Sequence, residues 1–287
     1  MTELVLENEA IIRLGFFAGV LSSVAAWEWL APRRARSHSR LARWPSNLGI
    51  VAVNTVVVRV LFPAAAVGAA WFAAERGWGV LGLLDLPYWL AVILSVAVLD
   101  LTIYLQHVMF HAVPLLWRLH RMHHADLDID VTTGARFHPF EIVLSMGIKL
   151  AVVVLIGAPP FAVVIFEVLL NATAMFNHGN IRIPGGIDRV LRWLVVTPDM
   201  HRVHHSVVAD ETNSNFGFNL PWWDRLFGTY RAQPGAGHEA MVIGIEQFRE
   251  RKYLRLNWLL IQPFLGPVGE YAIGGRKGSV RDGAARS

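Results

Sequence analysis

The sequence predicts an all-α integral membrane protein, a helical bundle of about five membrane segments with a helical cap on its cytosolic side. Two properties predict this class: the amino-acid composition and the length of the apolar runs. Of the 287 residues, 54% are hydrophobic and only 17% are charged, whereas about 25% of residues are charged in soluble domains. A soluble core of this size does not require so much apolar sequence, and a lipid bilayer does.

The apolar runs divide the membrane part into three spans and a hairpin. A span needs about 20 mostly apolar residues, and three runs meet this requirement, at about 11–32, 48–74 and 88–108. Gly157, Pro159 and Pro160 interrupt a further run, which predicts a hairpin of two shorter segments, 142–157 and 160–176. Residues 1–273 then form one membrane domain. The Gly- and Arg-rich tail 274–287 is predicted to be disordered.

The distribution of arginines predicts the orientation in the membrane. Five arginines lie in the stretch 33–43, after the first span, and basic loops stay on the cytoplasmic side. Counting the crossings from this loop puts 107–141 and 177–260 on the same side. These two segments hold eleven of the twelve histidines. We therefore expect a protein of the inner (plasma) membrane whose functional site faces the cytoplasm.

Cysteine content and net charge exclude several classes of protein. The chain has no cysteine, so disulfides, thiolate metal sites and a cysteine nucleophile are excluded. The net charge of +4 is compatible with nucleic-acid binding. However, the basic residues are not interleaved with aromatic residues along one stripe, and basic loops beside membrane spans explain the charge better. We expect no nucleic-acid partner.

Nine histidines form short patterns in which several rings point the same way. Residues three or four apart share one face of a helix, as in HxxxH and in the two HxxHH patterns, HRMHH and HRVHH. A ninth histidine, in FNHGN, directly follows the second hairpin segment and is placed to close the same site. The nine are His107, His111, His120, His123, His124, His178, His201, His204 and His205. His38 and His238 lie outside these patterns, and we interpret them as bystanders.

Nine imidazoles are too many for one metal ion and suit two ions with four or five nitrogen ligands each. All-imidazole ligation fits iron, zinc, copper or nickel. A site of this kind beside a bilayer points to lipid chemistry at the membrane surface. The sequence therefore predicts that the cap holds a polyhistidine site for two metals.

Four more residues are candidates to orient the ligand rings, because a metal-bound histidine commonly donates its other N–H to an acceptor. Asp100 lies two helical turns before His107, and Asp199 and Glu141 lie within three residues of a histidine. Alternative roles are a helix cap for Asp199 and Glu141, and an ion pair of Asp100 with Arg59 within the bundle. His138 precedes a proline and a glutamate that resemble a helix start, so we expect it behind the ligands and not among them.

The motifs resemble the fatty acid hydroxylase / sterol desaturase superfamily over about 130 residues, from Asp100 to Tyr230. The matching stretches are DLTIYLQHVMFH, LWRLHRMHH, RFHPFE, FNHGN, TPDMHRVHHS and NFGFNLPWWDRLFGTY. The resemblance implies a helical membrane bundle whose cytosolic cap holds two non-haem Fe ions with the nine histidines as ligands. It implies an O2-dependent hydroxylase or desaturase that acts on a C–H bond of a membrane lipid such as a sterol, fatty acyl chain or carotenoid.

Two details qualify this resemblance. Some fatty-acid hydroxylases carry a second HxxxH near the HGN position, whereas His178 stands alone here. No cytochrome b5-like domain is fused to this sequence, so the resemblance implies a separate electron donor, a ferredoxin or a cytochrome b5-like protein. Zinc competes well for imidazole, and we expect that it can replace iron in purified protein.

Three other functions are compatible with a histidine-rich membrane protein. A b-type cytochrome places paired histidines inside its spans, and here they lie beyond the spans. A metal transporter places its ligands at mid-membrane, where only Arg59 and Asp100 are expected. A zinc hydrolase needs about three protein ligands and an open position, so nine histidines exceed its needs. A polyhistidine zinc protein, either a hydrolase or a transporter, remains the alternative.

Overall fold

The structure, a computed structural model, describes residues 2–275 and consists of helices joined by loops. The long helices are α2 (Glu9–Leu30), α3 (Arg40–Leu61), α5 (Tyr88–Ala112), α7 (Pro139–Ile156) and α8 (Pro160–Asn177). The shorter α-helices are α1 (Thr2–Glu7), α4 (Ala65–Glu75), α6 (Pro114–His124), α9 (Gly185–Leu191), α10 (Pro198–His204), α11 (Ala209–Thr212), α12 (Trp222–Leu226), α13 (Gly237–Ala240) and α14 (Leu256–Ile261). The 3-10 helices are η1 (Val80–Leu83), η2 (Thr133–Ala135), η3 (Arg251–Leu254), η4 (Gln262–Phe264) and η5 (Ile273–Gly275).

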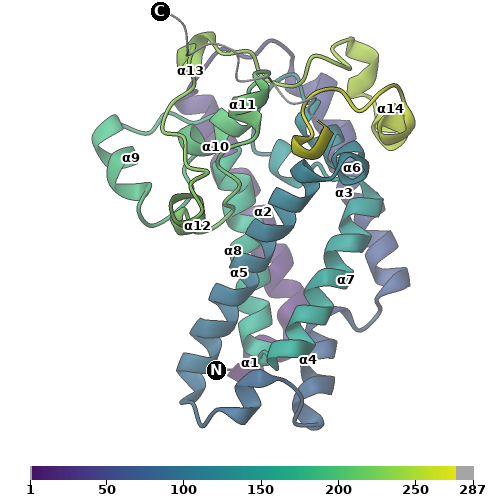
Figure 1. Ribbon diagram of the computed structural model, residues 1–287, viewed down its shortest axis with the longest axis vertical. Coiled ribbons are helices and arrows are strands. Elements are labelled where there is room, and N and C mark those ends of the chain that lie inside the picture. The colour runs from purple at the N-terminus through teal and green to yellow at the C-terminus, as the bar shows by residue number, and fades with distance from the viewer. Residues whose placement is uncertain (1, 276–287) are drawn as a thin grey trace, which may run out of the picture.

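The long helices form a membrane bundle, and the short ones form a cap at one end of it. Five helical stretches are long and apolar enough to cross a bilayer, which confirms the predicted number. Figure 1 shows the bundle with α1 at its lower end, whereas α6 and the short helices α9 to α14 gather at the upper end. No strand occurs within residues 2–275. The predicted all-α membrane bundle with a helical cap is therefore confirmed.

The second membrane stretch differs in detail from the predicted run 48–74. α3 ends at Leu61 and α4 begins only at Ala65. Pro63 lies in the break, because proline lacks the N–H that would continue the helical hydrogen bonds. At its other end α3 begins at Arg40, eight residues before the apolar run. These residues lengthen the helix by about 12 Å on the side of the cap.

The hairpin between α7 and α8 turns at the predicted Gly and Pro residues. Gly157 follows α7 with a φ of +69°, a conformation that glycine adopts without steric cost. A Cβ atom there would also lie 2.5 Å from the carbonyl oxygen of Trp78, so a larger residue would push the preceding loop away. Of the predicted tail 274–287, residues 276–287 lie outside the described residues.

An apolar core fills the bundle and reaches the cap. Leu99 and Ile103 of α5, Val153 of α7 and Phe166 of α8 are buried in one cluster. Phe218 of the cap belongs to the same cluster. The cluster therefore forms a continuous apolar path from the bundle interior to the underside of the cap.

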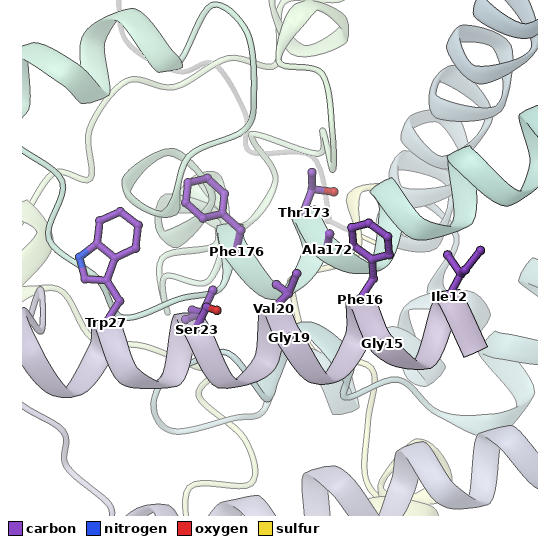
Figure 2. Close-up of a pocket in the computed structure, with 11 residues that line it drawn as sticks. Ile12, Gly15, Phe16, Gly19, Val20, Ser23, Trp27, Ala172, Thr173 and Phe176 are labelled. Atoms are coloured by element: carbon purple, nitrogen blue, oxygen red, sulfur yellow. The ribbon is translucent and has the colours of Figure 1, made fainter. Parts of the chain in front are cut away.

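An apolar groove runs along the outside of the bundle between α2 and α8. Its volume is about 710 Å³. Figure 2 shows Phe16, Val20 and Trp27 of α2 beside Thr173 and Phe176 of α8 along this groove. These side chains belong to two candidate membrane spans, so the groove lies along the membrane part of the bundle.

Candidate metal centre

The nine predicted histidines come together at the end of the bundle that carries the cap. His107 and His111 lie on the last turns of α5, where the helix leaves the apolar core. Val113 breaks the helix, and Pro114 begins α6, which carries the HRMHH histidines. His178 follows α8 as its C-cap. The side chain of Thr197 accepts a hydrogen bond from the Met200 N–H and starts α10, which carries the HRVHH histidines.

The nine rings divide into two groups, each compact enough to hold a metal ion. One group contains His107, His111, His120, His124 and His204, and the other contains His123, His178, His201 and His205. The potential ligand atoms within each group lie within 4.8 Å of one another. Every one of the nine side chains is buried. Each HxxHH unit contributes histidines to both groups. Both groups therefore require α6 and α10 to be correctly placed next to each other.

Hydrogen bonds on the outer side of the cluster fix the orientation of most rings. The Nδ1 atoms of His107, His178 and His204 lie 2.8, 2.6 and 2.7 Å from the carbonyl oxygens of Phe216, Ala174 and Ser214. Those of His123 and His111 lie 3.2 Å from the Arg136 carbonyl oxygen and 3.1 Å from Asn213 Oδ1. A carbonyl oxygen only accepts hydrogen bonds, so the proton of each such ring lies on Nδ1 and its Nε2 presents a lone pair.

The Nε2 atoms converge, and this arrangement fits metal ions. His178 Nε2 lies 3.1 to 3.2 Å from the Nε2 atoms of His123, His201 and His205. In the other group His107 and His120 approach to 3.0 Å through the same atoms. His204 Nε2 is buried without any partner. Lone pairs facing one another in a buried space repel, and a cation between them removes the repulsion.

Burial keeps these imidazoles neutral. It lowers the pKa of His120 to about 3 and that of His178 to about 3, where the backbone hydrogen bond to Ala174 opposes the shift. Burial, with the neighbouring rings, also holds the pKa of His204 and His205 well below the usual range. Neutral imidazole is the form that binds metal ions.

Of the four residues predicted to orient the ligand rings, only Glu141 contacts a ligand candidate. Its Oε1 lies 2.7 Å from His120 Nδ1. Asp100 instead accepts hydrogen bonds from the Trp223 indole and from the Leu220 N–H. The predicted orienting role of Asp100 is therefore wrong, and so is the alternative pair with Arg59.

Asp199 and His138 also differ from the prediction. Asp199 forms ion pairs with Arg33 and Arg202 and lies 3.5 Å from His238. Its carboxylate thus links helix α10 to the loop that precedes α3. His138 is the N-cap of α7, where its Nδ1 accepts from Phe140, and its Nε2 lies 3.1 Å from the Leu260 carbonyl oxygen. Neither residue hydrogen-bonds any of the nine rings within residues 2–275.

A buried ion network that the sequence did not reveal supports the loop between α6 and α7. Arg43 of α3 donates to Asp126 and Asp130 over 2.5 to 2.7 Å, and Arg136 lies 3.0 Å from Asp126. All four side chains are fully buried. Burial alone would raise the pKa of Asp126, but the two guanidinium groups hold it well below its usual range. The network thereby fixes the Arg136 carbonyl that contacts His123.

Two phenylalanines pack against the boundary between the two histidine groups, on the side of the bundle. We call this boundary the seam. The Phe137 ring stacks on the His123 ring with 4.5 Å between the ring centroids, and its centroid lies 6.2 Å from that of His120. The centroid of the Phe218 ring lies 5.0 Å from that of His107 and 5.8 Å from that of His201. Each phenyl ring therefore touches one histidine of each group. The two rings also approach each other at 6.4 Å, and both pack in the apolar cluster of the bundle.

Comparison with known proteins identifies the family. Residues 92–229 match the model of the fatty acid hydroxylase family. The chain carries a fatty acid hydroxylase domain. The matched segment contains all nine histidines, and the resemblance that their motifs indicated is confirmed. Residues 92–229 thus form a fatty acid hydroxylase domain in a chain with five candidate membrane spans.

Curated relatives act on several kinds of lipid. Ornithine lipid hydroxylase OlsE of Rhizobium tropici is 30% identical over 52% of this chain and 44% of its own length. Human (Homo sapiens) alkylglycerol monooxygenase is 26% identical over 56% of this chain and 34% of its own length. The very-long-chain aldehyde decarbonylase GL1-1 of Oryza sativa subsp. japonica is 29% identical over 63% of this chain and 31% of its own length. The chain spans less than half the length of these relatives. No solved structure matches the chain.

Proposed function

We propose that the protein is an O2-dependent hydroxylase or desaturase that acts on a C–H bond of a membrane lipid. The observation that carries this proposal is the pair of all-imidazole groups whose seam meets the apolar core of a membrane bundle. Relatives of the same family are named as lipid hydroxylases and monooxygenases. The sterol, fatty acyl, carotenoid and related lipids are all candidate substrates.

The nine histidines would hold two non-haem Fe ions, one in each group, and zinc can replace them in purified protein. When bound, the two irons would supply reductive activation of O2, an oxidising power that no side chain provides. Glu141 and the carbonyl groups of Phe216, Ser214 and Ala174 would keep the rings aimed inward. Burial of all nine rings excludes water from the reacting bond.

The apolar part of the substrate would approach from the bundle side, against Phe137 and Phe218. These rings are the only apolar side chains among the described aromatic contacts that touch both histidine groups. A lipid chain that displaces or slides past them brings one C–H bond to the seam. The two phenylalanines thus select which carbon reacts.

The site would face the cytoplasm of the inner (plasma) membrane and receive electrons from a separate ferredoxin or cytochrome b5-like donor. The arginine-rich stretch 33–43 lies at the same end of the molecule as the histidines, because Arg33 pairs with Asp199 and its N–H donates to the Asn180 carbonyl. Basic loops remain on the cytoplasmic side. A transporter is disfavoured because the ligand candidates lie at one end of the bundle and not at its middle.

Lipid analysis tests this function. Lipids from cells that express the chain are compared by mass spectrometry with lipids from cells that express the His123→Ala variant. The parent chain is expected to produce a lipid that is heavier by one oxygen atom, or lighter by two hydrogen atoms, only when O2 is present. Identical lipid profiles, with the parent chain loaded with iron and supplied with reductant, would contradict the proposal.

A further inference from the structure

A second cleft lies on the opposite side of α3 from its buried arginine. The cleft has a volume of about 560 Å³ and lies between the first two turns of α3 and helix η3. Leu41, Pro45 and Ser46 form one wall, and the basic residues Arg251, Lys252 and Arg255 form the other. None of the nine histidines lines it. It is therefore a site separate from the candidate metal centre.

The lower part of the cleft lies at the height expected for the lipid headgroups. The apolar run of the second span begins at Leu48, and a helix rises 1.5 Å per residue, so Ser46 and Leu41 stand about 3 and 10 Å above that point. The headgroup layer is about 5–7 Å thick on each side of the hydrocarbon core, so Ser46 falls within it and Leu41 lies at its aqueous edge. Leu256 packs on Gly49, which holds the basic wall at the same height as the α3 wall.

The basic wall continues into a segment with exposed apolar side chains. Ile261 of α14 and Phe264 of η4 are 40% and 64% exposed. Phe264 contacts Phe140, which is also exposed, on the first turn of α7. A short segment with cations at one end and exposed apolar residues at the other is typical of a membrane interface. The Lys252 ammonium also lies near the Tyr253 and Trp258 rings, and such aromatic residues favour the interface.

The charges in the cleft are not balanced by the protein. Lys252 pairs with Glu250 over 2.8 Å. Arg251 and Arg255 form no ion pair with any residue in 2–275 and are exposed. An exposed apolar residue, Leu41, faces these two guanidinium groups across the cleft. The cleft thus offers two unpaired cations and an apolar wall to the same ligand.

We propose that this cleft binds the phosphate headgroup of an anionic phospholipid such as phosphatidylglycerol. The two arginines would contact the phosphate, and the chains of the lipid would descend along the apolar face of α3. Basic pockets beside membrane helices bind anionic headgroups in this way. The bound lipid would hold η3 and α14 against α3, close to the Met122 side chain of the ligand-bearing helix α6.

Native mass spectrometry of the purified full chain in detergent tests the site. Phosphatidylglycerol and phosphatidylcholine are titrated separately onto the parent chain and onto the double variant R251Q/R255Q. The parent chain is expected to bind phosphatidylglycerol more tightly than phosphatidylcholine. The double variant is expected to lose about 25-fold in affinity for phosphatidylglycerol, roughly fivefold for each basic residue at an anionic headgroup.

A matched control and a competition experiment separate the alternatives. R36Q/R189Q removes the same charge from two exposed arginines that lie outside the cleft and form no ion pair within residues 2–275, and it is expected to leave the affinity within about twofold of the parent, as for isolated surface charges. An equal loss in both double variants would overturn the site in favour of general surface attraction. A parent chain that does not distinguish the two lipids would also overturn it. Inorganic phosphate in excess is expected to leave the lipid bound, and displacement would show that the cleft takes a free anion instead.

Discussion

Glu141 on the first turn of α7 lies 2.7 Å from the Nδ1 atom of His120. This contact links a membrane helix to the ligand-bearing helix α6. A carboxylate that accepts the outer N–H of a metal-bound histidine fixes the ring and raises its basicity. The remaining oxygen, Oε2, is buried without a partner, so the carboxylate serves the ring and no other group in residues 2–275.

Glu141→Ala is therefore expected to weaken metal binding by about 10–100-fold, the usual cost of losing such a partner. Glu141→Gln retains an oxygen that accepts from His120 and is expected to restore most of the affinity. The measurement is metal content at a series of chelator concentrations, with the exposed Glu239→Gln as control. If the Ala and Gln variants lose metal equally, the hydrogen bond does not orient the ring.

Arg43 is expected to be the most sensitive position outside the histidine cluster. Arg43→Met leaves Asp126 and Asp130 buried without their main partner, and breaking a buried pair typically costs about 3–5 kcal/mol. Thermal unfolding in detergent, followed by circular dichroism, measures the loss. Arg43→Lys keeps the charge and is expected to be less destabilised.

Exposed Arg36 is the control for this experiment, because a surface substitution changes stability by about 0.5 kcal/mol or less. Equal unfolding midpoints for Arg43→Met and Arg36→Met would show that the network contributes nothing to the fold.

Phe218→Ala is expected to change which carbon of the lipid reacts. The substitution opens space at the seam between the histidine groups, so the chain can bind at another depth. Phe166→Ala is the matched control, because Phe166 lies in the same buried cluster but has no ring contact with a histidine. Both variants should lose similar stability, about 3–5 kcal/mol. Mass spectrometry of the products is expected to show a new position of oxidation only for Phe218→Ala; the same shift in both would assign it to general loosening.

The orientation in the membrane can be tested with single cysteines, because the chain has none. Ser37 lies in the arginine-rich loop and Asp85 in the loop before α5, and both are exposed. Ser37→Cys is expected to resist a membrane-impermeant thiol reagent in intact cells, whereas Asp85→Cys is expected to react. The reverse labelling pattern would place the histidines outside the cytoplasm.

The sequence predicted the elements whose signal is local. Apolar run length predicted the five membrane segments, and the spacing within HxxxH and HxxHH predicted that these rings share helix faces. Glu141 was also proposed from a local signal, because it lies three residues after His138. These features depend on residues close together in the chain.

Contacts between distant segments could not be predicted from the sequence. Asp100 does lie on the same face of α5 as His107, but the cap folds back over that face and the Trp223 indole takes the carboxylate. Arg43 looked like one more basic loop residue, yet it reaches Asp126 across 83 positions of sequence. Carbonyl oxygens such as that of Phe216 leave no sequence signal, because every residue carries one.

Metal content of the purified chain tests the central claim most directly. Iron and zinc are measured by elemental analysis in the parent chain, in His204→Ala and in His123→Ala, with His38→Ala as control. These two histidines belong to different groups, so each substitution should lower the content of one group, from two metal ions per chain towards one. His38→Ala should leave two ions. A parent chain that is fully active with one metal ion or none, or a His204→Ala variant that keeps both ions and full activity, would contradict the two-metal site.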